Sequence, residues 1–322
     1  MQLVPLAAPL LLSSDAWTYW DHGRISAVHG ANPYVDAPNE FAADPAFRYV
    51  GADWRDTTSV YGPAFTLASE PVALAAGTSP DAAAWLFKTL AAVAVLAAAF
   101  LAARLAPRPP LAFAFVAWNP LLALHAAGGG HNDAWVGAAV MAALALAAGS
   151  RRQLAGVAWV AAILVKWVPA VFLVLRMFEA RAIGRRVGHA GFAAATAVVL
   201  GVATWRYGSD WLSAFGPLAK NANEETRYAV PHRLERLGVP DPVALGLLLA
   251  ALAGAYAWLA RQAWRGRARL ALAGVLLLLA TPYLAPWYLA WVVPLAAVEE
   301  DRAARLLTLG LCAYLLPQTV PV

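Results

Sequence analysis

The sequence is poor in charge and nearly free of cysteine. Only 13% of its 322 residues are charged, against about 25% in typical soluble domains. Because 61% are hydrophobic, the composition argues against a soluble enzyme and against a disordered tail. The one cysteine, Cys312, lies inside an apolar stretch, which excludes a disulfide framework and a cysteine-based metal site. The sequence also lacks a glycine-rich phosphate loop, a zinc motif and a Ser-His-Asp order.

Long runs rich in Ala, Leu and Val fill most of the chain. A helix of about 20 apolar residues is long enough to cross a bilayer. The sequence therefore predicts an all-α, polytopic bundle of transmembrane helices, with about nine to eleven membrane segments, some of them short or re-entrant. Clear spanning segments are 82–105, 187–204 and 242–259. The first twelve residues are apolar but too short to span, and we expect Met1 to lie inside a longer first helix.

Two apolar runs are interrupted at their centres. The run 154–175 carries Lys166 and Pro169, which predicts a re-entrant helix that breaks there and is buried in protein. The run 270–298 contains prolines at positions 282 and 286, which predict a hairpin of two short helices.

Arginine marks one side of the predicted bundle. The net charge is +5, and most of the excess falls in short gaps between apolar runs, as the positive-inside rule expects of cytoplasmic loops. This distribution explains the basic charge without a nucleic-acid partner. It places the polar segment 205–241 outside the cytoplasm and predicts a multi-pass membrane protein, with the lipid bilayer as its surroundings.

The first candidate for chemistry is Asp15, which follows the first apolar run. A carboxylate at the water interface can act as a general base or bind a metal. Tyr19, four residues on, would share its helix face. Asp21 and His22 would add a second acid and a titratable nitrogen. The alternative is structural, with Asp15 capping a helix after two serines and the neighbouring aromatic rings forming an interfacial belt.

The second candidate is the turn in which three glycines, 128–130, precede His131, Asn132 and Asp133. Glycines let the backbone approach a ligand closely, and the polar residues supply donors, acceptors and one charge. A helix cap alone would need fewer functional side chains, so the turn is interpreted as part of a site.

Lys166 is the third candidate, because an ionisable group at mid-membrane costs about 3 kcal/mol unless it is paired. A lipid phosphate is a suitable partner, and snorkelling or an ion pair within the bundle is the alternative. Trp287 and Tyr288 lie at the second proline break, where rings either stack on sugars or anchor the chain at the interface. Asn32-Pro33-Tyr34 and Tyr61-Gly62-Pro63 alone predict turns. They become candidates for a site only in combination with the other motifs.

The order of these motifs resembles the GT-C superfamily of integral-membrane glycosyltransferases, and more narrowly the actinobacterial polyprenol-phosphate-mannose-dependent α-mannosyltransferases. The landmarks that carry the resemblance cover most of the chain: Asp15 with Tyr19, Gly23 and Arg24; Asn32-Pro33-Tyr34; Tyr61-Gly62-Pro63; Asn119-Pro120; Gly130-His131-Asn132-Asp133; Lys166 with Pro169; and Pro286-Trp287-Tyr288 with Trp291 and Pro294. The resemblance implies a single transmembrane glycosyltransferase domain over residues 1–322. Segments 13–59 and 205–241 would be its first and second extracytoplasmic loops.

The resemblance also implies an activity. A hexose, expected to be mannose, would pass with inversion from a polyprenyl-phosphate donor to a cell-envelope glycan or glycolipid acceptor on the outer face of the plasma membrane. Asp15 would accept the proton of the attacking hydroxyl. The cationic candidates for the leaving phosphate are Arg24, His131, Lys166, Arg227 and Arg233. The remaining candidates for substrate binding are Tyr19, His22, Asn32, Tyr34, Tyr61, Asn132, Asp133, Trp287 and Tyr288.

Several alternatives stay open. Some relatives hold a metal through paired acids, but Trp17 stands two residues after Asp15, so dependence on a divalent cation, Mg or Mn, is undecided. Arabinose, glucose or galactose are other candidate sugars. A lipid-linked sugar transporter or flippase would place charges near the midplane, whereas the acids here cluster in the first polar segment, which favours the enzyme. A non-catalytic scaffold is a weaker rival. The enzyme hypothesis requires Asp15 and the 131–133 turn to meet in one cavity.

Overall fold

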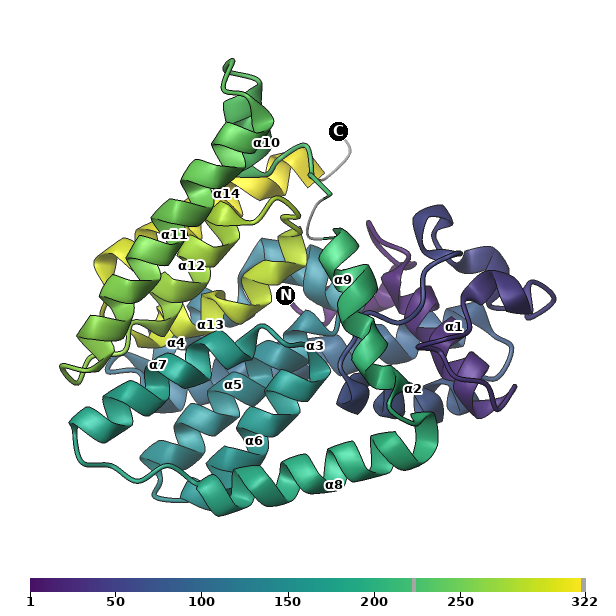
Figure 1. Cartoon of the computed structure of the whole chain (residues 1–322), viewed down its shortest axis with the longest axis horizontal. Helices are drawn as coiled ribbons and strands as arrows, with labels where there is room; N and C mark the ends of the chain where they lie inside the picture. The colour runs from purple at the N-terminus through teal and green to yellow at the C-terminus, as the bar shows by residue number, and fades with distance from the viewer. Residues whose placement is uncertain (222–223, 320–322) are drawn as a thin grey trace.

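The computed structural model describes residues 1–221 and 224–319, and over these ranges it is helical without any strand (Figure 1). The α-helices are α1 (Asp15–Ala27), α2 (Pro63–Ala76), α3 (Pro80–Leu105), α4 (Pro109–Ala117), α5 (Asp133–Ala148), α6 (Arg152–Val165), α7 (Pro169–Ala182), α8 (His189–Tyr207), α9 (Phe215–Asn221), α10 (Val230–Glu235), α11 (Asp241–Ala263), α12 (Leu270–Ala280), α13 (Val293–Val298) and α14 (Arg302–Thr319). Short 3-10 helices are η1 (Val4–Ala7), η2 (Pro38–Phe41), η3 (Phe47–Tyr49), η4 (Ala52–Trp54), η6 (Asp210–Ala214) and η7 (Pro286–Trp291), and η5 (Leu122–Ala127) is a π-helix.

Proline determines where several of these helices begin. Pro63, Pro80, Pro109 and Pro169 each stand in the first turn of a helix, where the missing N–H has no intrahelical partner to lose. Both predicted breaks are confirmed. One interrupted run becomes α6 and α7 with the break at 166–168, and the other becomes α12, η7 and α13.

The arginine-rich loops come together at one end of the molecule, which we call the basic end (residues 104–108, 150–152, 176–189, 261–269 and 299–305). Arg108 and Arg305 line a common cavity, and Arg269 pairs with Asp301 at 2.6 Å. The loop 176–189 shares cavities with residue 152 on one side and residue 264 on the other. This arrangement agrees with the prediction that the basic loops lie on the same side of the membrane.

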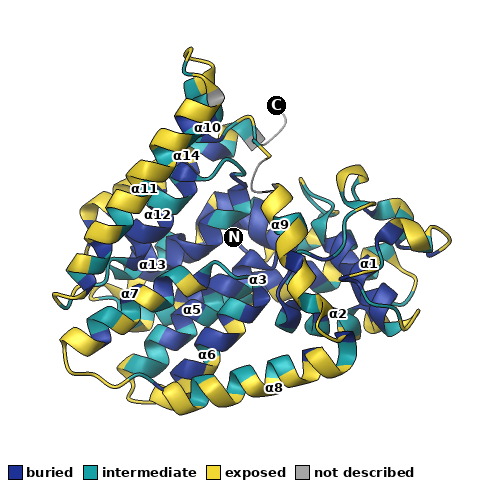
Figure 2. Cartoon of the chain, in the orientation of Figure 1, coloured by how far each residue is buried: buried dark blue, intermediate teal, exposed yellow. Residues whose placement is uncertain are grey.

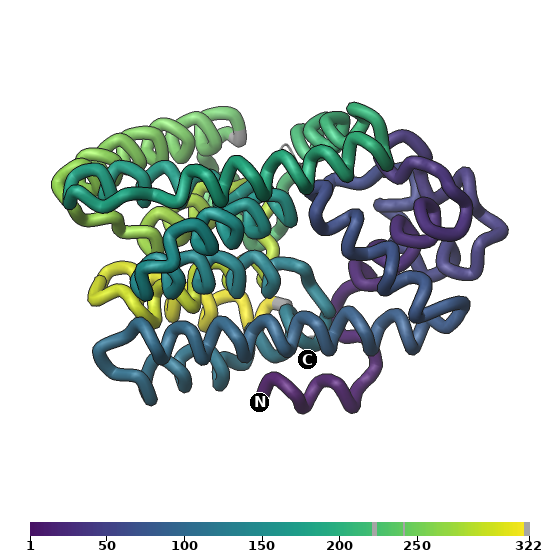
Figure 3. Tube along the Cα trace, turned by 90° about the horizontal axis from the view of Figure 1, so that it is seen from below, coloured from purple at the N-terminus to yellow at the C-terminus, as the bar shows by residue number. Residues whose placement is uncertain are grey.

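The opposite end is built around α1, at the right in Figure 1. There the indole N–H of Trp17 donates to the carbonyl of Pro80, the first residue of α3 (3.0 Å). The N-terminal segment lies beside α3 (Figure 3), and Lys88 of α3 donates to the carbonyl of Pro9 (3.1 Å). Since α3 has 26 residues, it separates the two ends by about 39 Å.

Segment 13–59 is a folded unit although its composition suggested a polar loop. The guanidinium group of Arg24 donates to both carboxylate oxygens of Asp44 (2.8 and 2.9 Å) and to the carbonyl of Gly77, so it joins α1, the loop and the end of α2. Ten of the 13 residues of α1 are buried. The polar side chains of this segment therefore hold the unit together from inside.

The described residues include two helices, Pro80–Leu105 and Pro242–Ala263, that are long and apolar enough to cross a membrane by length and composition. Four further apolar helices have 10–17 residues. Many residues of α8 and α11 are exposed, as the yellow parts of their ribbons in Figure 2 show. They include large apolar residues such as Trp205, 85% exposed, and Leu247, 62% exposed. The count of nine to eleven membrane segments stays a prediction.

We predict that Gly62→Ala destabilises the protein by about 1–3 kcal/mol. The N–H of Gly62 donates to the Val165 carbonyl (3.1 Å), and a Cβ on Gly62 would lie 2.1 Å from the Leu164 carbonyl oxygen. The added methyl group would therefore push α2 away from the end of α6. The matched control is Gly201→Ala on α8, where a Cβ meets open space. Thermal unfolding should show a lower midpoint for Gly62→Ala alone, and equal midpoints would contradict the packing described here.

Candidate active site

Asp15 and the 131–133 turn meet, as predicted, but the turn is not part of the lining of the cavity to which Asp15 contributes. His131 Nδ1 lies 3.2 Å from Asp15 Oδ2, and the hydroxyl of Tyr19 donates to the same oxygen at 3.3 Å. Asp15 begins α1 and Tyr19 lies one turn later, so the helix itself aligns the pair. His131 is fully buried, whereas the Asp15 side chain keeps 14% of its surface exposed. The carboxylate is thus the accessible member of this group.

The second half of the cluster is an ion pair between Lys166 and Asp133. Lys166 Nζ lies 2.9 and 3.0 Å from the two carboxylate oxygens of Asp133. The Asp133 side chain is fully buried, and that of Lys166 is 17% exposed. Lys166 Nζ also lies over the rings of Tyr288 and Trp291, 4.6 and 5.4 Å from their centroids, which adds cation–π attraction. The buried carboxylate of Asp133 therefore positions the partly exposed ammonium group of Lys166.

Close backbone approaches bring these elements together. Gly130 has φ +69°, and a Cβ there would lie 3.2 Å from the Ala16 methyl group and from the backbone of Lys88. The glycines therefore fit the turn against α1 and α3, where the sequence analysis expected a ligand. Gly137 approaches the Ala290 carbonyl in the same way, so α5 packs on η7. As a result the rings of His131 and Trp287 stack, with centroids 3.8 Å apart.

A cavity of about 210 Å³ opens beside the cluster. Asp15 and Lys166 are the two charged residues among the described residues that line it. The other lining residues are Trp54, Val60, Tyr61, Trp167, Val168, Leu218, Leu277, Leu278, Thr281, Tyr283, Trp287, Tyr288 and Trp291. His131 and Asp133 lie behind the wall. The cavity is therefore mainly apolar and aromatic, with one anionic and one cationic group.

The electrostatics of the cluster favour the ionised form of Asp15. Burial, the largest influence, raises the pKa of Asp15, but the hydrogen bond and charge of His131 and the charge of Lys166 outweigh it and lower the pKa below 3.8. Asp15 is consequently a carboxylate at neutral pH.

Some predicted residues lie away from the cavity. Arg24 is bound to Asp44 and does not reach the cluster. His22 is buried, and burial lowers the pKa of its imidazole to about 4. The Asn32 amide donates to the carbonyl of Tyr207 and to Asp210 (both 3.0 Å). These three residues support the structure of the first polar segment and its junction with the end of α8.

Other predicted residues are structural neighbours of the site. The hydroxyl of Tyr34 donates to the Tyr61 carbonyl (3.1 Å), so it holds the backbone of a residue that lines the cavity. Asn132 is fully buried in the turn behind the cavity. Arg227 donates to the Gln318 carbonyl (3.0 Å) and Arg233 to the Tyr314 hydroxyl (2.8 Å). These two arginines are engaged by α14 and do not line the cavity.

Several residues that line the cavity are not among the predicted site residues. Trp167 and Tyr283 lie next to selected residues, and the breaks in the helices around them were a usable signal. Trp54 and Leu218 come from η4 and α9. No local pattern marks them, because only the fold brings these distant segments together.

The cluster does not fit a divalent cation. Both oxygens of Asp133 contact Lys166, so a metal ion would have to displace an ammonium group. Among the described residues, the group with three suitable ligand atoms within 4.8 Å of one another is Glu225, His232 and Glu235, and these residues do not line the cavity. The chemistry is therefore derived from the side chains alone.

Comparison with known proteins identifies a family. Residues 3–181 match the family model described as alpha-(1->6)-mannopyranosyltransferase, N-terminal domain. Alpha-(1->6)-mannopyranosyltransferase A of Mycobacterium tuberculosis is 29% identical, over 96% of this chain and 67% of its own length. A probable alpha-(1->6)-mannopyranosyltransferase of Mycolicibacterium smegmatis is 27% identical, over 91% and 62%. The A enzyme of Corynebacterium glutamicum is 28% identical, over 49% and 33%.

The chain is thus related to glycosyltransferases that are named for the transfer of mannose. It belongs to the alpha-(1->6)-mannopyranosyltransferase family, because the family model covers more than half of it. The chain spans between one third and two thirds of the length of these curated relatives. No solved structure matches it.

We predict that Asp21→Asn stabilises the protein at pH 8 and has little effect near pH 4. Asp21 is buried in α1, and burial, followed by the charge of Asp44, raises its pKa to about 7. The unfolded chain loses this proton near pH 4 and the native state near pH 7, so stability falls between these values as pH rises. Asn cannot ionise and avoids a loss of about 2–4 kcal/mol.

Thermal unfolding across pH 4–8 measures this effect. Asp81→Asn, at an exposed position, is the control and should follow the parent protein at every pH. A constant difference between Asp21→Asn and the parent across the range would contradict the assignment.

Proposed function

We propose that the protein transfers a hexose, mannose, from a polyprenyl-phosphate donor to a cell-envelope glycan or glycolipid, with inversion at the anomeric carbon. The observation that carries the proposal is the cavity in which Asp15 and Lys166 are the charged residues. The names of the relatives support mannose and an α-1,6 linkage, and they favour transfer over the transport alternative.

Asp15 is the proposed base. It is exposed to the cavity and ionised at neutral pH, so it can accept a proton from an acceptor hydroxyl while that oxygen bonds to the anomeric carbon. The anomeric carbon–oxygen bond to the donor phosphate breaks, and the phosphate leaves with the electron pair. Because one carboxylate assists a single displacement, the configuration inverts. His131 and Tyr19 hold the carboxylate in place and act through it.

Lys166 is the proposed partner of the leaving phosphate. Its charge faces a mainly apolar cavity, where electrostatic stabilisation of a developing anion is strong. Asp133 holds the ammonium group of Lys166 in place, and its carboxylate partly neutralises the positive charge until the phosphate leaves. The aromatic rings of Tyr61, Trp287 and Tyr288 form surfaces on which a sugar can stack.

The apolar lining suits a lipid-linked donor better than a free nucleotide sugar. Leu277 and Leu278 of α12 and Val168 at the start of α7 continue the lining away from the charged pair. A prenyl chain would bury its surface on these side chains. Since the basic end is the cytoplasmic side under the positive-inside rule, the cavity would open at the outer face of a multi-pass plasma-membrane protein. The exposed apolar flanks of α8 and α11 support this placement.

We predict that Asp15→Asn lowers the rate of mannosyl transfer by about 10²–10⁴. The amide keeps the size of the side chain but cannot take the proton. Membranes that contain the variant would be assayed with a polyprenyl-phosphate mannose donor. Asp81→Asn serves as the control for expression and folding and should retain full activity. A variant Asp15→Asn with undiminished turnover would remove Asp15 from the role of base.

We predict that Lys166→Met loses activity by about 10²–10³ and stability by about 3–5 kcal/mol, because Asp133 stays buried without its partner. The double variant Lys166→Met/Asp133→Asn removes the unpaired charge and should recover stability. Activity should stay low in the double variant, since the phosphate still lacks its cation. Thermal unfolding and transfer assays on the three proteins separate the effects, and recovery of both properties together would exclude a catalytic role for Lys166.

A further inference from the structure

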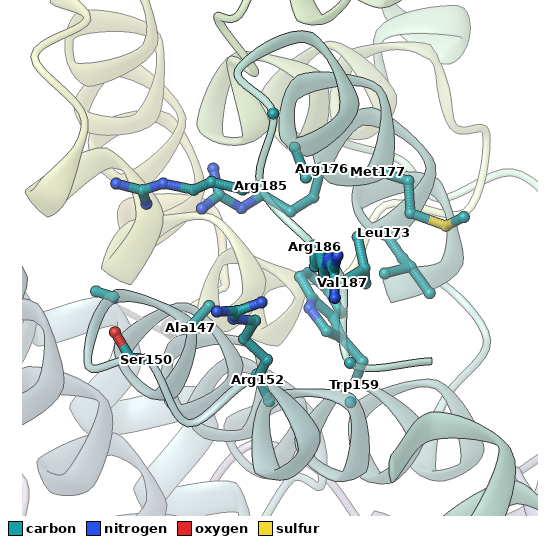
Figure 4. Close-up of a pocket in the computed structure, with 16 residues that line it drawn as sticks. Ala147, Ser150, Arg152, Trp159, Leu173, Arg176, Met177, Arg185, Arg186 and Val187 are labelled. Atoms are coloured by element: carbon teal, nitrogen blue, oxygen red, sulfur yellow. The ribbon is translucent and has the colours of Figure 1, made fainter. Parts of the chain in front are cut away.

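A second and larger cavity, of about 490 Å³, lies at the basic end (Figure 4). It opens between the start of α6 and the end of α7, together with the loop that follows α7. Four arginines line it: Arg152, Arg176, Arg185 and Arg186. No acidic residue is among the described residues that line it. The cavity is therefore a concave site of one charge sign, about one helix length away from the Asp15 cluster.

Most of this positive charge is not neutralised within the protein. Arg176 pairs with Glu179, but the structure contains no ion pair for Arg152, Arg185 or Arg186 among the described residues. Like charges that are brought together in a cavity repel one another. Their gathering is favourable when a multivalent anion occupies the space between them.

The backbone around the cavity is closely fitted. A Cβ on Gly188 would lie 1.9 Å from the Arg152 carbonyl oxygen, and one on Gly156 would lie 2.4 Å from the Gly188 carbonyl oxygen. The side-chain oxygen of Gln153 accepts from the N–H of Gly191 (2.7 Å). These contacts fix the loop after α7 against α6. The backbone segments that carry the arginines on both sides of the opening are thus held in fixed positions.

The floor and the surroundings of the cavity are apolar. Trp159, which is 3% exposed, and Leu173 line the cavity beside the arginines, with Leu173 at the right in Figure 4. Outside the lining, Leu154 on α6 is 52% exposed and Val174 on α7 is 41% exposed, and Met177 in the lining is 40% exposed. A ligand that fits this environment carries an anionic head and long apolar chains. A free phosphate compound would use the arginines and leave the apolar flanks uncovered.

A neighbouring cavity extends the basic surface. It measures about 560 Å³ and shares Arg185 and Arg186 with the first cavity. It adds Arg181, His189 and Trp264 to the wall. The ring of Trp264 stacks on Phe178 at 4.9 Å between centroids, an amphipathic arrangement typical of the membrane interface.

We propose that the arginine cavity binds the phosphate headgroup of an anionic phospholipid from the leaflet at the basic end, with the acyl chains lying along the apolar flanks of α6 and α7. This site is separate from the donor cavity and takes a structural lipid. The lipid would connect the start of α6 to the end of α7. The opposite ends of these two helices meet at the break that contains Lys166. Binding should therefore stabilise the fold without any sugar transfer.

The test uses the purified 322-residue chain in a mild detergent with added dioleoyl-phosphatidylglycerol. Native mass spectrometry counts the lipid retained, and thermal unfolding reports the stabilisation. Dioleoyl-phosphatidylcholine is the zwitterionic control, and glycerol phosphate and inorganic phosphate are the soluble controls. We expect retention and a raised unfolding midpoint with phosphatidylglycerol alone.

The variant Arg185→Gln/Arg186→Gln should bind phosphatidylglycerol about tenfold to thirtyfold more weakly. The matched control Arg261→Gln/Arg302→Gln removes two exposed arginines of the same end that line neither cavity and should bind as the parent protein does. If the first double variant fails to fold, Arg152→Gln replaces it. Equal binding by all variants, equal retention of phosphatidylcholine, or equal stabilisation by soluble phosphates would each overturn the proposal. Transfer activity enters none of these measurements, so they stand apart from the proposed function.

Discussion

The ion pair between Lys166 and Asp133 is the interaction on which the arrangement of the site depends. A buried charge is costly unless it is paired and hydrogen-bonded, and here each partner satisfies the other across two segments that are 33 residues apart. The pair fixes the start of α5 against the break between α6 and α7. Because the 131–133 turn opens α5, the same interaction also fixes His131 against Asp15. Removing either charge would disturb every functional side chain that we describe.

The distribution of charge gives the molecule two unlike ends. The cavity beside α1 is lined by one carboxylate and one lysine, whereas the cavity at the basic end is lined by four arginines and by no acidic residue among the described residues. Helices such as α3 and α11 connect the ends and show apolar side chains to their surroundings. A bilayer matches this order of zones, since its apolar core is bounded by polar surfaces and its cytoplasmic leaflet carries negative charge. One pattern therefore accounts for the positions of both the cavity beside Asp15 and the arginine cavity.

Local rules predicted much of the fold. Proline positions gave the breaks at 166–169 and 282–286, and long apolar runs gave helices. The meeting of Asp15 with His131 followed from a family resemblance, because spacing alone cannot bring residues 116 positions apart into contact. Arg24 shows the limit of this reasoning. Its sequence context does not reveal Asp44 as a partner, and only the folded loop shows that its charge is already used. Trp54 reaches the cavity through long-range packing that no local pattern encodes.

The junction between Asn32 and the end of α8 has a mechanical consequence. The Asn32 amide binds the backbone of Tyr207 and the side chain of Asp210, and Ser213 donates to the Tyr34 carbonyl (2.8 Å). These hydrogen bonds join residues 32–34 to residues 207–213, which come from opposite halves of the sequence. The first polar segment contributes Trp54 to the wall of the cavity. Any movement of this segment away from the cavity therefore has to carry the end of α8 with it or break these three hydrogen bonds.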